Sequence, residues 1–204
     1  MQIKYSEYLE KTSFTKEELL AASWGSLITD PPYNVDGVIN LPSLPAPPML
    51  MFDRVTEVIK HGNKGRIVAE QDIALDAWFF QCHFRSDPVQ PGCLGVDSVW
   101  QLLGFYASLC GAVGAGRALG SKEIEFFGQI RPHNKIVRYE IDVRRYIGST
   151  SGQASFILGS GTVIVDEEPI YTIKEAKVGI FNGIKYTNYP HKTNNAVGGK
   201  MRKD

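Results

Sequence analysis

The sequence predicts an α+β domain in which an antiparallel sheet wraps a long buried helix. Several β-branched and aromatic runs, partly alternating with polar residues, are bounded by glycine, proline, asparagine or aspartate, as is typical of strands. One long apolar stretch, residues 97–116, interrupts them. A helix formed from that stretch is apolar all round and must be buried on every side, which the surrounding strands can achieve.

A short helix is expected near the N-terminus. Thr15 and Glu18 have the spacing of a capping box, and the helix should end near Gly25. Residues 1–14 are assigned to an N-terminal extension. Residues 28–48 are proline-rich, and since proline removes backbone donors and fixes φ, this segment is expected to form an extended arm.

The strands are expected from Met49 onward. They are MLMFDRVTEVI, RIVAEQDIAL, KEIEFFGQI, KIVRYEIDVRRYI, GQASFILGSGTVIVD and PIYTIKEAKVGIF. The turn VDEEPI should join the last two strands as a hairpin. The domain is therefore placed at residues 15–182. Residues 183–204 contain few apolar residues and are expected to form a flexible polar C-terminal tail.

The helix between the second and third strands is expected to be DSVWQLLGFYASLCGAVGAG. A membrane span is a weaker alternative, because Gln101 and several glycines interrupt the stretch. The glycines between residues 111 and 120 resemble a nucleotide loop only superficially, since they follow a helix and not a strand. They are expected to end the helix.

Charge and cysteine content exclude several functional classes. The chain has 22 Lys and Arg against 22 Asp and Glu, which gives no reason to expect nucleic acid or an anionic membrane as partner. No signal-peptide-like stretch opens the sequence, so a cytoplasmic protein is expected. Cys82, Cys93 and Cys110 lack CxxC spacing and are expected to be buried, reduced thiols, without a disulfide or zinc framework. A catalytic thiolate at Cys82, beside His83, is a minor alternative.

The stretch WFFQCHFRSDPVQPGCLGVDSVWQ, residues 78–101, concentrates the residues that could carry chemistry. His83 is the one histidine set in apolar sequence, and Asp97 stands where the long helix is expected to begin. Gly92 would let a ligand approach backbone N–H groups. The segment therefore supplies a base, an acid and an oxyanion donor. The alternatives are a hydrogen-bonded core histidine and an aspartate that only caps the helix.

These residues resemble a known family. The string HFRSDPVQPGCLGVDSVWQ, with LPAPPMLMFDRV before it and FFGQI and YTIKEAKVGIF after it, is similar to the bacterial 3-hydroxydecanoyl-(acyl carrier protein) dehydratase/isomerases of type II fatty acid synthesis. The resemblance covers about Thr15 to Phe181. The proline-rich arm and the tail after Phe181 depart from the pattern of the family, but neither interrupts the motif.

The resemblance implies a hot-dog fold and a homodimer with shared active sites. It assigns His83 as the catalytic base, Asp97 of the opposite protomer as the acid, and the backbone N–H of Gly92 as the group that binds the thioester carbonyl. Val89 and Cys93 would line the site. The implied reaction is dehydration of 3-hydroxyacyl thioesters to trans-2-enoyl thioesters, without metal or organic cofactor. Aspartate in place of glutamate at the acidic position favours additional isomerisation of trans-2-decenoyl to cis-3-decenoyl thioester.

Three other functions remain open: a dehydratase without isomerase activity, a hot-dog thioesterase, and a non-catalytic acyl-binding protein. The implied partner is an acyl carrier protein, which is acidic and should meet basic residues near the tunnel mouth. The candidate basic residues are Arg131, Lys135, Arg138, Arg144 and Arg145. The alternative is that they form only a solvated strand face.

Overall fold

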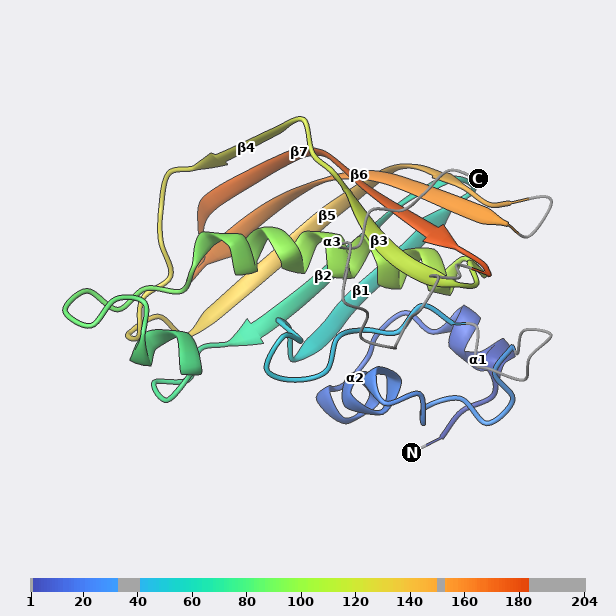
Figure 1. Cartoon of the computed structure of the whole chain (residues 1–204), viewed down its shortest axis with the longest axis horizontal. Coiled ribbons are helices and arrows are strands. Elements are labelled where there is room, and N and C mark those ends of the chain that lie inside the picture. Colours follow the sequence, from blue (N-terminus) through green and yellow to red (C-terminus); the bar gives the residue numbers. More distant parts are fainter. Residues whose placement is uncertain (1, 33–40, 150–152, 184–204) are drawn as a thin grey trace, which may run out of the picture.

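The chain folds into a seven-stranded antiparallel sheet that curves around one long helix, α3 (Figure 1). The computed structural model describes residues 2–32, 41–149 and 153–183. Residues 33–40 of the expected arm and 184–204 of the expected tail lie outside the described residues.

The strands are β1 (Arg54–His61), β2 (Lys64–Asp72), β3 (Ala115–Gly120), β4 (Glu123–Phe126), β5 (Ile136–Ile147), β6 (Ala154–Val165) and β7 (Glu168–Phe181). The helices are α1 (Tyr5–Glu10), α2 (Lys16–Ser23) and α3 (Gly92–Leu109), with a short 3₁₀ helix, η1 (Trp78–Gln81). The strand order is β1-β2-β5-β6-β7-β3, and β4 also pairs with β7. This arrangement confirms the expected hot-dog fold.

Helix α3 is buried against the concave face of the sheet. Val99, Leu102 and Leu103 are fully buried in the common core. Strand β6 approaches the helix so closely that its glycines are required: a Cβ at Gly159 would lie 2.7 Å from Leu103 Cδ2, and one at Gly161 would lie 3.0 Å from Val99 Cγ2. Within the described ranges, no helix is long and apolar enough to cross a membrane.

The start of α3 differs from the expectation. The helix begins at Gly92 with Pro91 as its N-cap residue, so Asp97 lies in the second turn and does not cap the helix. Gly92 and Gly95, which precede the expected start of the helix at Asp97, are helical, and aromatic rings pack against both. A Cβ at Gly95 would lie 2.6 Å from the ring of Tyr171. The rings that pack against this part of the helix, Phe126 and Tyr171, come from β4 and β7, which no local pattern reveals.

The bounds of two expected elements also need correction. The helix expected over residues 97–116 ends at Leu109, and residues 115–120 form strand β3, which pairs with the second half of β7. Residues 49–53 precede β1, which begins at Arg54. The last hairpin is confirmed, since β6 and β7 pair directly and Asp166 and Glu167 both have positive φ, as a two-residue type I′ turn requires.

The N-terminal residues form a layer beside α3 and β1 (Figure 1). The capping box of α2 is confirmed: Thr15 N–H donates to Glu18, and Glu18 N–H donates to the Thr15 hydroxyl. Helix α1 was not expected; it is fixed by Tyr8, which is buried and shares a short hydrogen bond with Ser108 of α3. The layer therefore belongs to the core.

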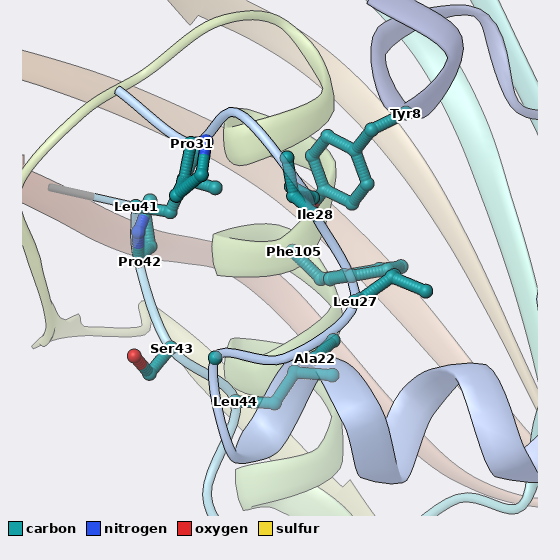
Figure 2. A pocket seen from close by; sticks show the side chains of 11 residues that line it. Tyr8, Ala22, Leu27, Ile28, Pro31, Leu41, Pro42, Ser43, Leu44 and Phe105 are labelled. Atoms are coloured by element: carbon teal, nitrogen blue, oxygen red, sulfur yellow. The ribbon is translucent and has the colours of Figure 1, made fainter. Parts of the chain in front are cut away.

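A small pocket lies between this layer and α3 (Figure 2). Tyr8, Leu27 and Phe105 are among its lining residues. Its volume is about 30 Å³, which is room for no more than about two water molecules. It is too small for an acyl chain.

Candidate active site

A larger open pocket of about 590 Å³ lies at the N-terminal end of α3. Its walls come from the segment after η1, the first turns of α3, strand β4 with the residues that follow it, and strand β7. The lining residues are His83, Val89, Gln90, Gly92, Cys93, Val96, Trp100, Ile124, Phe126, Gly128, Gln129 and Tyr171. The pocket thus brings together four of the five predicted site residues, namely His83, Val89, Gly92 and Cys93.

The imidazole of His83 has one nitrogen fixed and one available. Nδ1 lies 3.0 Å from the carbonyl oxygen of Val89, and the Val89 N–H donates back to the His83 carbonyl at 2.8 Å. Since a carbonyl oxygen only accepts, neutral His83 carries its proton on Nδ1 and a lone pair on Nε2. The ring also stacks on Phe84, with centroids 4.0 Å apart. Nε2 is therefore suited to accept a proton in the pocket.

The first two backbone N–H groups of α3 are unused in the described part of the chain. Neither Gly92 N–H nor Cys93 N–H donates a hydrogen bond there, and Pro91 offers no side-chain cap. Unpaired N–H groups at a helix N-terminus favour an oxygen that gains negative charge. Gly92 also lies close to the pocket wall, because a Cβ there would lie 2.7 Å from Cε1 of Phe126 and the ring would have to shift. The pocket is therefore lined by both a base and oxyanion donors.

Asp97 does not line this pocket. Its Oδ2 accepts a hydrogen bond of 2.6 Å from Nε2 of Gln101, one helical turn further along, and the same nitrogen donates to the Met49 carbonyl at 2.8 Å. Asp97 follows Cys93 and precedes Trp100 on one stripe of α3 that is not fully buried. The described chain therefore does not bring Asp97 and His83 into one pocket, and the predicted pairing across two protomers stays a prediction.

Comparison with known families identifies the domain. A family model described as FabA-like domain matches residues 44–174, more than half of the chain. The chain belongs to the FabA-like family. The matched range contains the whole pocket of this FabA-like domain, including His83, Gly92 and Tyr171, and it also contains Asp97.

Three solved structures illustrate what the FabA-like domain resembles. The dehydratase heterocomplex ApeI:P from Xenorhabdus doucetiae matches at 13% identity over 68% of this chain and 86% of that chain, with a TM-score of 0.48. A MaoC-like dehydratase from Rhodospirillum rubrum matches at 14% identity over 61% and 96%, with a TM-score of 0.41. A variant of a hypothetical thioesterase from Streptococcus pneumoniae matches at 11% identity over 64% and 90%, with a TM-score of 0.45.

Several pocket residues were not predicted from the sequence. Phe126 of β4 and Tyr171 of β7 pack edge to face, with centroids 4.8 Å apart, and form the wall opposite Gly92 and Gly95. Burial raises the pKa of Tyr171 to about 12, so its hydroxyl stays protonated near neutral pH. The segments FFGQI and YTIKEAK already carried the family resemblance, but only the β4–β7 pairing shows that both reach the pocket.

The cysteines are not buried as expected. Cys82 and Cys93 are exposed and Cys110 is half-buried, and all three are free thiols. Cys93 is exposed because it faces the open pocket. Across residues 2–32, 41–149 and 153–183, the His, Cys, Asp and Glu side chains form no cluster of three that could hold a metal ion.

Proposed function

We propose that this FabA-like domain dehydrates 3-hydroxyacyl thioesters carried on acyl carrier protein. The observation that carries the proposal is the pocket in which an imidazole with an available Nε2 lies beside the unpaired N–H groups of Gly92 and Cys93. A base and oxyanion donors are what removal of a proton next to a thioester carbonyl requires. The family match to the FabA-like domain supports dehydratase chemistry of this kind.

In the proposed reaction, Nε2 of His83 takes a proton from C2 of the substrate. The electrons of the broken C–H bond form the C2=C3 double bond, with charge gathering transiently on the thioester oxygen, where the Gly92 N–H stabilises it. The C3–O bond breaks, and the departing hydroxide takes a proton from a protonated Asp97 and leaves as water. Proton exchange with solvent then returns both side chains to their starting states.

The Asp97 carboxyl in this scheme belongs to the second copy of a homodimer. Two features support a dimer. The stripe of α3 that carries Asp97 is only half-buried in the single chain. The sheet edge formed by β3 and β4 also leaves large apolar side chains exposed, with Leu119 at 43%, Phe126 at 52% and Phe127 at 60%. An unpaired edge with exposed apolar residues is typical of an interface.

Isomerisation of the trans-2 product to cis-3 would use the same histidine. His83 would return a proton to C2 after removing one from C4, so the double bond moves by one position without loss of atoms. Aspartate at position 97 supports this bifunctional reaction, as the sequence resemblance implies.

One experiment tests the reaction. Purified protein is incubated with a 3-hydroxydecanoyl thioester, and the products are separated by chromatography and identified by mass spectrometry. We expect loss of water and, with isomerisation, a cis-3 product; free acid would support a thioesterase, and bound but unchanged substrate a non-catalytic acyl-binding protein. His83→Ala should abolish dehydration while the dimer persists, and retained turnover would remove His83 from the mechanism.

We propose that the carrier protein docks near one end of β5 and not along its whole length. Lys135 precedes β5 and Arg145 lies near its far end, about 33 Å away at about 3.3 Å per residue, so they cannot share one docking site. The pocket lies at the Arg131 end, because Gln129 lines it and Ile130 is bonded to Gln90. We therefore place the carrier there.

Charge reversal at the two ends of β5 tests this placement. The Arg131→Glu/Lys135→Glu variant should raise KM for a carrier-linked substrate and leave KM for a small thioester unchanged, because only the carrier is acidic. Arg144→Glu/Arg145→Glu is the matched control and should change neither KM. An equal effect of both pairs on the carrier-linked substrate would contradict docking at the Arg131 end.

A further inference from the structure

A buried cluster of three polar side chains adjoins the pocket, of which Gln90 is also a lining residue. Gln71 of β2 and Gln90 exchange amide hydrogen bonds, with Gln71 Nε2 donating to Gln90 Oε1 at 3.3 Å and Gln90 Nε2 donating to Gln71 Oε1 at 3.5 Å. The hydroxyl of Tyr139 on β5 donates to Gln71 Oε1 at 2.7 Å. Gln71, Gln90 and Tyr139 are 8%, 2% and 0% exposed, so water cannot replace these partners.

Each member of this cluster depends on the others. A buried amide that loses its partner keeps the full cost of its lost hydration, whereas replacing both partners by apolar side chains can be nearly neutral. Burial raises the pKa of Tyr139, while hydrogen bonding by Ser98 and Gln90 lowers it, which places Ser98 of α3 at the same cluster. The cluster therefore joins β2, β5 and the first turns of α3.

Gln90 connects the cluster to the reacting groups. It follows Val89, whose carbonyl oxygen fixes the His83 ring, and it precedes Pro91 and Gly92 at the start of α3. Its own backbone N–H donates to Ile130 at 2.9 Å. A shift of Gln90 would therefore move both the acceptor that orients His83 and the N–H groups that face the pocket.

We propose that Gln71, Gln90 and Tyr139 are positioning residues that hold His83 and the N-terminus of α3 in their reactive geometry. The inference deepens the proposed dehydratase function and rests on it for its kinetic consequence. Its structural consequence is that the amide pairing keeps the His83 proton on Nδ1. That can be measured without any substrate.

The kinetic test compares two single variants with their double variant. Gln90→Leu leaves the Gln71 amide nitrogen without a partner, and Gln71→Leu leaves the Gln90 amide and the Tyr139 hydroxyl without theirs. Displacements below an ångström at a reacting group cost up to about 10²-fold, so we expect each single variant to lower kcat by about tenfold to a hundredfold with little change in KM. The double variant should recover part of this loss, because neither amide remains and the Tyr139 hydroxyl, which loses Gln71, still has Ser98 beside it. Gln153→Leu, on an exposed glutamine, is the matched control and should have no effect.

The structural test uses nitrogen NMR of ¹⁵N-histidine-labelled protein, with the His83 signals assigned from the His83→Ala spectrum. We expect Nδ1 of His83 to be protonated in the wild type and the double variant, and the single variants to show a mixture of Nδ1–H and Nε2–H forms. This readout separates the two proposals. The dehydratase function alone would be refuted if the wild-type protein did not dehydrate the thioester while the wild type and the variants showed the expected tautomers.

The inference would be overturned if the single variants kept the wild-type kcat and the Nδ1–H tautomer and were only easier to unfold. The cluster would then stabilise the fold without positioning His83. A double variant with lower kcat than either single variant would also overturn it. Thermal unfolding is measured for each variant first. The kcat values and NMR spectra are then compared at a temperature at which every variant is folded.

Discussion

Adding one methyl group at Gly92 tests whether the start of α3 forms part of a reactive site. In Gly92→Ala the new Cβ would lie 2.7 Å from Cε1 and 3.2 Å from Cδ1 and Cζ of Phe126. Ordinary contact begins near 3.4 Å, so the ring must move by about 0.7 Å. Phe126 is 52% exposed in the single chain, which lets it move, but it packs on Tyr171 and forms the pocket wall.

The expected effects on stability and on activity differ in size. Alanine is better than glycine inside a helix by at most about 1 kcal/mol, whereas overpacking typically costs about 1–3 kcal/mol. The free energy of unfolding should therefore fall by no more than about 3 kcal/mol. Alanine keeps the backbone N–H, but its methyl group and the displaced Phe126 ring crowd the space in front of this donor. Because a displacement of about 1 Å at a reacting group can cost about 10²-fold, we expect kcat/KM for dehydration to fall by about 10²-fold.

The activity assay follows formation of the enoyl thioester by its absorbance. Urea unfolding of the same samples gives the free energy of unfolding. Gly104→Ala is the matched control on the same helix, because the nearest atom to its new Cβ would be Val178 Cγ1 at 3.9 Å. The control should keep kcat/KM and gain up to about 1 kcal/mol of stability from helix propensity. A Gly92→Ala variant with wild-type kcat/KM would refute the assignment of this helix start to the site.

Three further substitutions test other contacts. Gln101→Leu removes the amide that donates to Asp97 Oδ2, so we expect a lower kcat with the dimer intact; an unchanged kcat, measured as above, would show that this contact does not orient the acid. Tyr8→Phe breaks the buried bond to Ser108 and should lower the free energy of unfolding by about 1–2 kcal/mol in urea with kcat unchanged; an unaltered midpoint would contradict a stabilising role for α1. Hydrogen bonds from an asparagine side chain and two backbone N–H groups lower the pKa of Asp166, so its carboxylate stabilises the fold above its unfolded pKa and this contribution is lost as pH falls through the lower folded pKa. The difference in urea midpoint between wild type and Asp166→Asn should therefore be largest near neutral pH and vanish in acid; a difference independent of pH would contradict this.

Most elements of the fold could be predicted because their signals are local. Thr15 and Glu18 satisfy each other's backbone donors within one helical turn, and the alternation of β5 and β6 reports which residues face the core. The first turn of α3 was missed because Pro91, Gly92 and Gly95, within five residues, disfavour a helix locally. Rings from β4 and β7, far along the chain, pack against these two glycines.

By itself, the sequence determined the antiparallel sheet around a buried helix and the residues of the family motif, since periodicity and motif spacing are properties of neighbouring residues. Tertiary structure decided that His83 keeps Nε2 available, that Asp97 lies outside the pocket of its own chain, and that Tyr139 lies against Gln71, 68 residues away. These relations arise only when distant segments pack. A side chain's hydrogen-bond partner depends on that packing, whereas its helix or strand depends mainly on its neighbours.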